Sequence, residues 1–177
     1  MADKNYYSVS DQNDLIIGNT TFPKGEVSPI EYSDIIKLSN ATNITIKGCT
    51  VHGGKEDCID MNRNCSNIVI EDTFLESNGN YCVTIKGGTK NVILKNITIT
   101  NHGKEADIDL GNWSDQSEEL TTDITLQNIV SEDGEPVKVR VLWADKPTVL
   151  GGNIKVVVIP RCLVRIYRFL RKRGLVP

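Results

Sequence analysis

The chain has 177 residues, of which 39% are hydrophobic and 24% are charged, and its formal net charge is −3. This length fits one domain with a continuous core, and the low hydrophobic fraction is typical of a solenoid, whose strands turn half of their residues to solvent. Residues 1–160 hold all 23 acids and 14 of the 20 bases, a net charge of −9, which argues against nucleic acid as the main partner.

The N-terminal residues 1–14 are polar and irregular, and we expect a tail or part of an N-terminal cap there. Polar residues follow Met1 directly, which predicts that the chain carries no signal peptide and is made in the cytoplasm. No apolar run approaches the ~20 residues of a membrane span, so we predict no membrane-spanning segment. Association with a virion is an alternative for the protein's location.

The central residues 15–159 carry a repeat of 24 residues. Asn43-Ile44-Thr45-Ile46 recurs as Asn67-Ile68-Val69-Ile70 and as Asn91-Val92-Ile93-Leu94. A fixed period in the low twenties is typical of a solenoid, and the alternation of β-branched residues with period 2 argues against helices. We therefore predict an all-β fold, a parallel β-helix of about five to six coils.

Each regular coil is predicted to contain three short strands and three turns. Turns with Gly, Asn or Asp recur after the first strand, as at Gly48, Asp72 and Asn96, and such residues tolerate the left-handed backbone that a sharp corner needs. Asn and Asp side chains at equivalent corners can also hydrogen-bond along the solenoid axis. The inward positions are expected to stack into two apolar ladders, Ile44, Ile68, Val92 and Ile124 in one and Ile46, Ile70, Leu94 and Leu126 in the other.

The C-terminal part departs from the regular repeat. The third coil runs for 32 residues because a polar loop is added at 111–119, and strands are predicted at 137–141 and 154–159. Residues 160–177 then show helical spacing of apolar and basic residues, with a start at Pro160 and an end at Gly174. We predict a basic amphipathic helix that caps the last open coil. The alternatives are binding to a membrane surface or anionic partner, and docking on a neighbouring copy in a homo-oligomer.

Five cysteines occur, without any C-x-x-C pair. Cys58 and Cys82 are expected on neighbouring coils, where a disulfide is the alternative to the interpretation that we prefer, reduced thiols in the core.

Four short segments, each about one coil after the last, carry a resemblance to known proteins. They are Tyr32-Ser33-Asp34-Ile35, Gly54-Lys55-Glu56-Asp57-Cys58-Ile59, Asn80-Tyr81-Cys82-Val83-Thr84-Ile85 and Ala106-Asp107-Ile108-Asp109-Leu110. Over residues 15–159 the chain resembles the right-handed parallel β-helix proteins of the pectin-lyase-like superfamily, with a local likeness to polygalacturonase-type glycoside hydrolases. Those relatives carry N-T-D, D-D, G-H-G and R-I-K at the four places.

The resemblance implies an incomplete catalytic set. Asp34 and Asp57 match acids of the family pattern, Glu56 replaces the first acid of D-D, and Tyr81 replaces the histidine. Both cations of R-I-K have become acids, which are Asp107 and Asp109.

Glycoside hydrolysis with inversion needs one protonated and one ionised carboxyl, roughly 6.5–9.5 Å apart. Asp34 and Asp57 on adjacent coils are expected about 5–10 Å apart, so this geometry is open. The acids at the R-I-K place would repel an acidic sugar, so we do not expect a working polygalacturonase. The residues that would carry lyase or glycosidase chemistry are Asp34, Glu56, Asp57 and Asp60, with Lys86.

The outward positions of the third strand form a charged column. It contains Lys37, Asp60, Thr84, Asp109 and Lys138 or Arg140, with Asn62 and Lys86 one step along. The resemblance implies that such a strand face can hold Ca²⁺, which takes six to eight oxygen ligands. The candidate ligands are Asp57, Asp60, Asp107 and Asp109, and the candidate substrate contacts are Asn62, Tyr81, Asp109 and Trp113. The alternative is a solvated sheet face of alternating charges that holds no site.

The two histidines, His52 and His102, each precede a glycine at corresponding corners, with Glu76 at the corner between them. We expect exposed turn residues there, and a proton-transfer cluster is the alternative. Trp113 in the polar loop would either stack on a sugar ring or pack against its own loop.

These features predict a pectin-lyase-like module that binds, and if active cleaves, a polysaccharide along the exposed strand face. The alternative is a non-catalytic structural or adhesive rod, such as a phage tail or appendage component, that forms oligomers.

Overall fold

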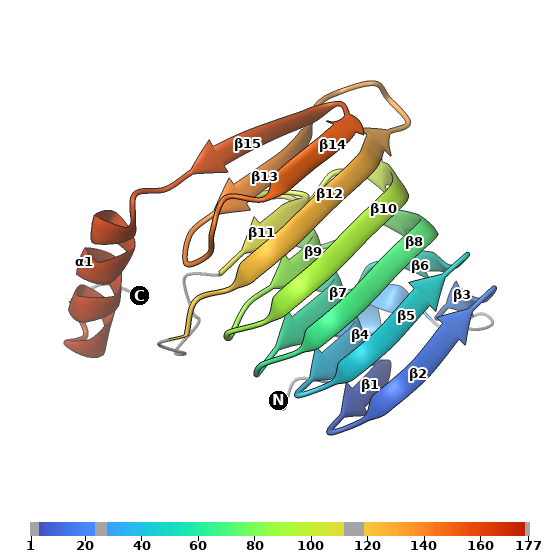
Figure 1. Ribbon diagram of the computed structural model, residues 1–177, viewed down its shortest axis with the longest axis horizontal. Helices are drawn as coiled ribbons and strands as arrows, with labels where there is room; N and C mark the ends of the chain where they lie inside the picture. The colour runs from blue at the N-terminus through green and yellow to red at the C-terminus, as the bar shows by residue number, and fades with distance from the viewer. Residues whose placement is uncertain (1–3, 24–27, 112–118, 176–177) are drawn as a thin grey trace.

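Two parallel sheets wind together as a coil (Figure 1). The computed structural model describes residues 4–23, 28–111 and 119–175. The seven-stranded sheet, here called sheet A, has the order β1 (Tyr7–Ser10), β4 (Asp34–Ser39), β7 (Asp57–Asn62), β9 (Tyr81–Ile85), β11 (Ile108–Leu110), β13 (Val137–Val141) and β15 (Ile154–Val158).

The eight-stranded sheet, here called sheet B, lies opposite sheet A across the core (Figure 1). Its main order is β14 (Thr148–Gly152), β12 (Thr122–Ser131), β10 (Lys90–Asn101), β8 (Ser66–Glu76), β5 (Thr42–Lys47) and β2 (Asn13–Gly18). The short strand β6 (Thr50–His52) pairs with both β3 (Thr21–Phe22) and β8. In chain order, the path alternates between the two sheets, directly from β8, β10, β12 and β14 and through the short strands β3 and β6 in the first two coils, which is the path of a parallel β-helix.

The two apolar ladders predicted from the repeat are confirmed. Ile44 pairs with Ile68, and Ile68 with Val92, in the register of sheet B. All eight ladder residues are buried, with the largest exposure at Ile124, 3%. Stacking side chains of similar size above one another is what lets a core form from coils that could not bury their apolar residues alone.

The predicted left-handed corners after the first strand of each coil are confirmed, but at three of them the strand continues through the corner instead of ending there. Asp72, Asn96 and Asn128 all adopt left-handed φ angles, from 51° to 53°. Each bends its chain within one continuous strand of 10 to 12 residues, because a single left-handed residue turns the backbone while the ladder bonds continue on either side. These coils therefore contain two strands instead of the three predicted.

Polar ladders join the corners along the axis, as predicted. The Asn67 side-chain amide donates to Asn43 Oδ1 at 2.9 Å, and that of Asn91 donates to Asn67 Oδ1 at 2.6 Å. The Asn96 amide donates in the same way to Asp72 Oδ1, at 2.8 Å.

The N-terminal segment is more regular than expected. Tyr7–Ser10 forms the strand β1 and pairs with β4, and β2 already begins at Asn13. Val9 is 1% exposed, so its side chain anchors β1 in the core, and in the described part of this segment only residues 4–6 and 11–12 lack strand structure.

The C-terminal helix α1 (Arg161–Lys172) is confirmed, and Gly174 follows it with a φ of 68°. It stands beside the solenoid at the end of an extended segment (Figure 1), and Val164 is its buried residue. The capping that we expected from it is only partial, because Val149 and Val158 occupy inward positions of the last coil and remain 40% and 52% exposed.

The five cysteines are free thiols, and Cys58 and Cys82 lie buried side by side without a bridge, as in the preferred interpretation. In the part of the chain that the structure describes, α1 is too short and too polar to cross a bilayer, and so is every other helical segment.

Candidate functional site

The charged column predicted on the outward face of sheet A is present. The strand register pairs Lys37 with Asp60, Asp60 with Thr84, and Thr84 with Asp109. Asp109 pairs in turn with Arg140. Of the two bases that the sequence offered for the next position of the column, Lys138 and Arg140, it is therefore Arg140 that occupies it. Neighbouring parallel strands are about 4.8 Å apart, so these side chains are in mutual contact range.

The column is not a solvated face of alternating charges. Asp60, Thr84 and Asp109 are at most 1% exposed, although they point away from the apolar core. The longer basic side chains lie over the acids, and those of Lys86 and Arg140 are themselves only 20% and 16% exposed. Ionisable groups are costly to remove from water, so their burial here needs a compensating arrangement.

Three carboxylates meet in the column's N-terminal half, and we call Asp34, Asp57 and Asp60 the carboxylate cluster. Asp34 begins β4 and Asp57 begins β7, and the register pairs them directly. One carboxylate oxygen from each of the three residues lies within 4.8 Å of the others. All three side chains are buried.

Two ammonium groups offset part of the negative charge of this cluster. Lys37 Nζ lies 2.8 Å from Asp34 Oδ2 and 2.9 Å from Asp60 Oδ2, and Lys86 Nζ lies 3.0 Å from Asp60 Oδ1. Three carboxylates beside two ammoniums leave one negative charge in excess if every acid is ionised. Binding of one proton would make the cluster neutral.

Asp57 is the member of the cluster best suited to hold that proton. Burial raises the pKa of Asp57 well above its ordinary value, and the neighbouring Asp60 and Asp34 raise it further. Burial also raises the pKa of Asp34, with Asp60 adding to the effect, while the ammonium of Lys37 opposes it. The cluster therefore contains two neighbouring carboxyls whose pKa values are raised, that of Asp57 more strongly than that of Asp34, and carboxyls whose pKa values differ are what general acid–base chemistry needs.

Lys86 is held as an ammonium. Burial works to lower its pKa, but Asp60 and Asp57 outweigh burial and the pKa is raised. Lys86 therefore fits the stabilisation of negative charge, and it does not fit the role of a general base.

Several buried oxygens of the site have no hydrogen-bond partner among the described residues. They include Asp34 Oδ1, Asp57 Oδ1 and Thr84 Oγ1. A buried polar atom without a partner costs about 1–3 kcal/mol, so these atoms have free capacity for a ligand hydroxyl, a water or a cation.

The column's C-terminal half holds a second polar group around Arg140. Its guanidinium donates from Nε to Asp109 Oδ1 at 2.7 Å and from Nη1 to Glu105 Oε2 at 2.9 Å. Tyr81 donates its hydroxyl to the same Glu105 oxygen at 2.6 Å and accepts from the guanidinium. A cation thus does stand near the segment Ala106-Asp107-Ile108-Asp109-Leu110, where the sequence has acids, but it comes from the next strand, β13.

The four acids predicted as a calcium site are not brought together. Asp57 and Asp60 join Asp34 in the carboxylate cluster, whereas Asp109 is paired with Arg140 and the Asp107 carboxylate faces His102. The cluster's oxygens fit a cation in kind. However, the ammoniums of Lys37 and Lys86 already lie within 3.0 Å of its carboxylates and offset two of the three negative charges, so a cation would compete with them for the same oxygens.

The remaining predicted contacts differ in their exposure. Glu56 is exposed beside Asp57, and the Asn62 amide donates to Asp60 Oδ2 at 3.1 Å. Tyr81 is only 5% exposed, so its ring offers little surface for stacking on a sugar. Trp113 lies outside the described residues.

A cavity of about 420 Å³ lies at the N-terminal end, lined by residues of β1, β2 and β3 and their neighbours, and is separate from the carboxylate cluster.

The histidines make two separate sets of polar contacts instead of one cluster. His52 Nδ1 contacts Glu76 Oε2, and His102 contacts Asp107, Ser131 and Asp133. His102 is 22% exposed in its side chain, so it is less open than the exposed turn residue that we expected. Its partners Ser131 and Asp133 were missed, because the 32-residue coil hides their spacing from the 24-residue repeat.

Replacing Asp57 by asparagine is expected to stabilise the protein at neutral pH. The folded-state pKa of Asp57 is raised, so wild-type stability falls as pH increases from the unfolded carboxyl pKa of 3.8 through the folded-state pKa, while asparagine does not titrate. We expect a gain of about 1–2 kcal/mol at pH 7, with a rise in Tm of about 2–4 °C per kcal/mol, and less gain at pH 4. Thermal unfolding at both pH values measures it, with Asp72→Asn at an exposed corner as control. A gain that is equal at both pH values would contradict the assignment.

Parallel strands in two facing sheets, apolar ladders and polar corner ladders define the class of parallel β-helix proteins. The chain belongs to the right-handed β-helix family, since the family model described as "Right handed beta helix region" matches residues 4–124. No curated protein and no solved structure matches the chain.

Proposed function

We propose that this protein binds a polysaccharide along the outward face of sheet A, and that Asp34 and Asp57 are the acid–base pair that acts on it. The carboxylate cluster is the observation that supports this proposal. It combines two carboxyls whose pKa values are raised to different extents with buried oxygens that have no partner among the described residues.

The chemistry follows from the two carboxyls. Protonated Asp57 would donate a proton to the oxygen of the bond that breaks. The Asp34 carboxylate would either take a proton from a sugar carbon, as in a lyase, or attack the anomeric carbon, as in a retaining hydrolase. The ammonium of Lys86 would stabilise negative charge that develops on the sugar. The oxygens of Asp34 and Asp57 lie within 4.8 Å, closer than the roughly 6.5–9.5 Å of inverting hydrolases, which favours a lyase or a retaining hydrolase.

A glycan array combined with an activity screen tests this function, on uronate and neutral polysaccharides, with and without Ca²⁺. We expect binding to at least one polymer, and release of reducing or unsaturated ends that Asp57→Asn abolishes while binding persists. Asp72→Asn should change neither, because this corner belongs to sheet B. Absence of binding to every polymer would overturn the proposal. Binding without product would overturn the assignment of Asp34 and Asp57 as an acid–base pair and would show that the protein only binds the polysaccharide.

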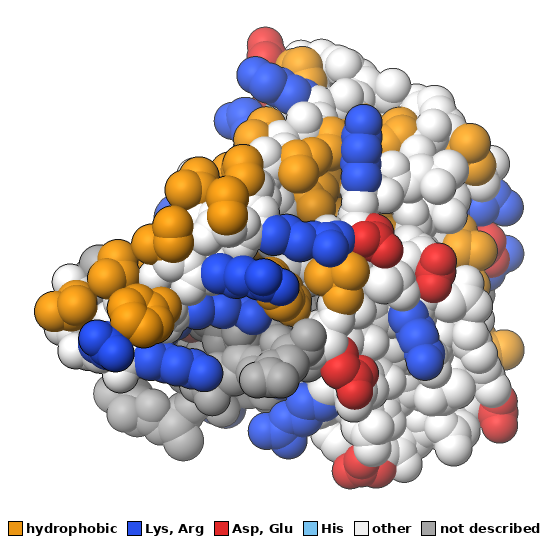
Figure 2. All heavy atoms as spheres, turned by 60° about the vertical axis from the view of Figure 1, so that its left-hand side comes forward, with side chains coloured by type: hydrophobic (Ala, Val, Ile, Leu, Met, Phe, Trp, Pro, Cys, Tyr) orange, Lys and Arg blue, Asp and Glu red, His pale blue; other side chains and the backbone are white. Residues whose placement is uncertain are grey.

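A second function, assembly into an oligomer, is supported by the C-terminal end. β14 and β15 are the edge strands of sheets B and A, and among the described residues each pairs with one neighbouring strand. In addition, Leu163, Ile166 and Phe169 of α1 are 51–54% exposed. Figure 2 shows apolar side chains gathering on this end of the molecule, with Lys and Arg beside them. Exposed apolar surface of this kind marks an interaction site.

The occupant that we propose for this end is a second copy, because an open coil edge is best covered by another coil edge. Light scattering should show a dimer or larger oligomer that the double substitution Ile166→Gln and Phe169→Gln dissociates. The exposed base Lys172, changed to Gln, is the control. A monomer at all concentrations would rule out this function and leave the polysaccharide proposal untouched.

A further inference from the structure

A second cluster of reactive side chains lies at the corner where β10 ends, remote in register from the carboxylate cluster. His102 Nδ1 faces the Asp107 carboxylate, at 3.0 Å from Oδ1 and 2.9 Å from Oδ2. His102 Nε2 faces the hydroxyl of Ser131, with 3.2 Å between Nε2 and Oγ. A serine, a histidine and a buried acid in this order form the constellation that activates a serine hydroxyl, whichever fold carries it.

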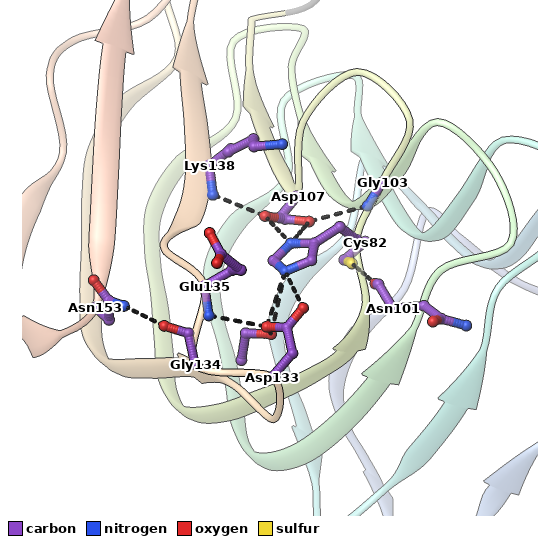
Figure 3. Close-up of polar contacts among 11 residues, drawn as sticks. Cys82, Asn101, Gly103, Asp107, Asp133, Gly134, Glu135, Lys138 and Asn153 are labelled. Carbon is purple, nitrogen blue, oxygen red and sulfur yellow. Dashed lines mark hydrogen bonds and ion pairs between the residues drawn. The ribbon is translucent and has the colours of Figure 1, made fainter.

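The acid of this constellation is rigidly placed. Asp107 is fully buried, and its carboxylate accepts the backbone N–H of Gly103 at 3.0 Å and that of Lys138 at 2.7 Å (Figure 3). The glycine is required, because a Cβ at position 103 would lie 2.1 Å from the Ala106 carbonyl oxygen. The fixed carboxylate holds the proton of the imidazole on Nδ1 and therefore directs Nε2 at Ser131.

The serine is placed where a substrate can reach it. Ser131 is the last residue of β12 and is half-buried, next to the turn that contains Gly134. Its hydroxyl donates to Asp133 Oδ1 at 2.6 Å, and the Asp133 side chain is 52% exposed and also lies 3.3 Å from His102 Nε2. Asp107 and Asp133 thus approach from opposite sides, with Glu135 and Lys138 nearby (Figure 3).

These charges set the protonation of the histidine. Partial burial opposes its charged form, but hydrogen bonds and charge from Asp107, and then from Asp133, raise the pKa of His102 above 6.5. The Ser131 hydroxyl and the Glu135 N–H hold the pKa of Asp133 at about 2, so its carboxylate is ionised throughout. Above the pKa of His102, Nε2 becomes an acceptor and the Ser131 proton can turn to it.

We propose that Ser131, His102 and Asp107 form a hydrolytic site that cleaves small neutral acyl esters through an acyl-serine intermediate. The acids Asp133 and Glu135 beside the serine disfavour anionic acyl groups, which is why the acyl group is neutral, as in an acetyl ester.

The reaction balances with water as the co-reactant. Ser131 Oγ attacks the ester carbonyl carbon while its proton passes to His102 Nε2. The ester C–O bond then breaks and the alkoxide leaves with that proton. Water attacks the acyl-serine and gives a proton to Nε2, the bond between the acyl carbon and Oγ breaks, and Ser131 Oγ regains the proton as the carboxylic acid departs. The Asp107 carboxylate, which faces Nδ1, stabilises the imidazolium.

The test uses the whole chain with p-nitrophenyl acetate as substrate and a fluorophosphonate as covalent probe. We expect one probe adduct per chain, mapped to Ser131 by peptide mass spectrometry, and absent in Ser131→Ala. The matched control is Ser10→Ala, an exposed serine that likewise ends a strand, and it should keep full labelling. His102→Gln should lower the rate of labelling about 10²–10⁴-fold.

A pH profile separates this role from a structural one. Labelling should rise with pH as His102 loses its proton, and Asp133→Asn should move the midpoint to lower pH while Ser131 is still labelled. Circular dichroism shows whether each variant is folded. Absence of an adduct on Ser131 in the folded wild-type chain between pH 6 and 9 would overturn the proposal, as would labelling that survives His102→Gln or a midpoint that Asp133→Asn leaves in place.

Discussion

Asp60→Asn is expected to lower the free energy of unfolding at pH 7 by about 3 kcal/mol, a value typical of breaking a buried ion pair from one side. Asp60 is 1% exposed and lies within 3.0 Å of two ammonium groups, those of Lys37 and Lys86. Asparagine has nearly the same shape but no charge, so both ammoniums would stay largely buried with less compensation. Urea unfolding at pH 7 measures the loss.

Asp57→Asn is the matched comparison, because the same chemical change in the same cluster should have the opposite sign. Lys37→Met provides a second check. In its background one of the two ammoniums is absent, so Asp60→Asn should cost less than in the wild-type chain, and the difference gives the coupling energy. A loss below about 0.5 kcal/mol in both backgrounds would show that the ammoniums are not held by Asp60.

The fold was predictable because its physical cause is periodic. A 24-residue spacing that places Ile44, Ile68 and Val92 in one column predicts both the sheet and its core, since inward positions must stack if coils are to bury them. The corners were predictable for a similar reason, because residues such as Asp72 and Asn96 tolerate left-handed backbone. That the corner would bend a strand without interrupting it could not be seen from residue types.

The candidate site was only partly predictable, because strand boundaries decide which way a side chain points. Asp107 and Asp109 are two residues apart, and in a regular strand they would share a face. β11 begins only at Ile108, however, so Asp107 belongs to the corner before it and binds His102. This boundary removes Asp107 from the predicted calcium ligands, and Asp109 is removed separately, because it pairs with Arg140.

Helix α1 shows a similar limit, since amphipathic spacing predicts a helix but does not say which face meets the protein. We expected the apolar face to cover the last coil. Instead Arg165 and Arg168 stack on Trp143, at 5.6 and 4.5 Å from the ring centroid, and Arg161 pairs with Asp145. The guanidinium–indole contacts turn the basic face toward the solenoid and leave the apolar face outward.

Arg140→Ala is expected to destabilise the folded protein by about 3 kcal/mol at pH 7. Arg140 is the cation that compensates Asp109, which is fully buried, and it also joins Glu105 and Tyr81 across strands. Burial already raises the pKa of Asp109, and Arg140 opposes that effect. Without the guanidinium the pKa would rise further, so an ionised Asp109 at pH 7 would be uncompensated.

The pH dependence distinguishes this cause from a simple loss of packing. Since the folded-state pKa of Asp109 is raised in the variant, its penalty is absent below the unfolded carboxyl pKa of 3.8 and grows as pH rises from there through the folded-state pKa. Urea unfolding should therefore show a smaller difference from wild type at pH 4 than at pH 7.

Lys138→Ala is the matched control, because Lys138 is an exposed base on the same face of β13, and it should cost less than about 0.5 kcal/mol. Arg140→Lys should recover only part of the loss, because one ammonium cannot replace a planar fork that reaches three acceptors. A difference that stays constant with pH would mean that Arg140 stabilises the sheet by packing alone.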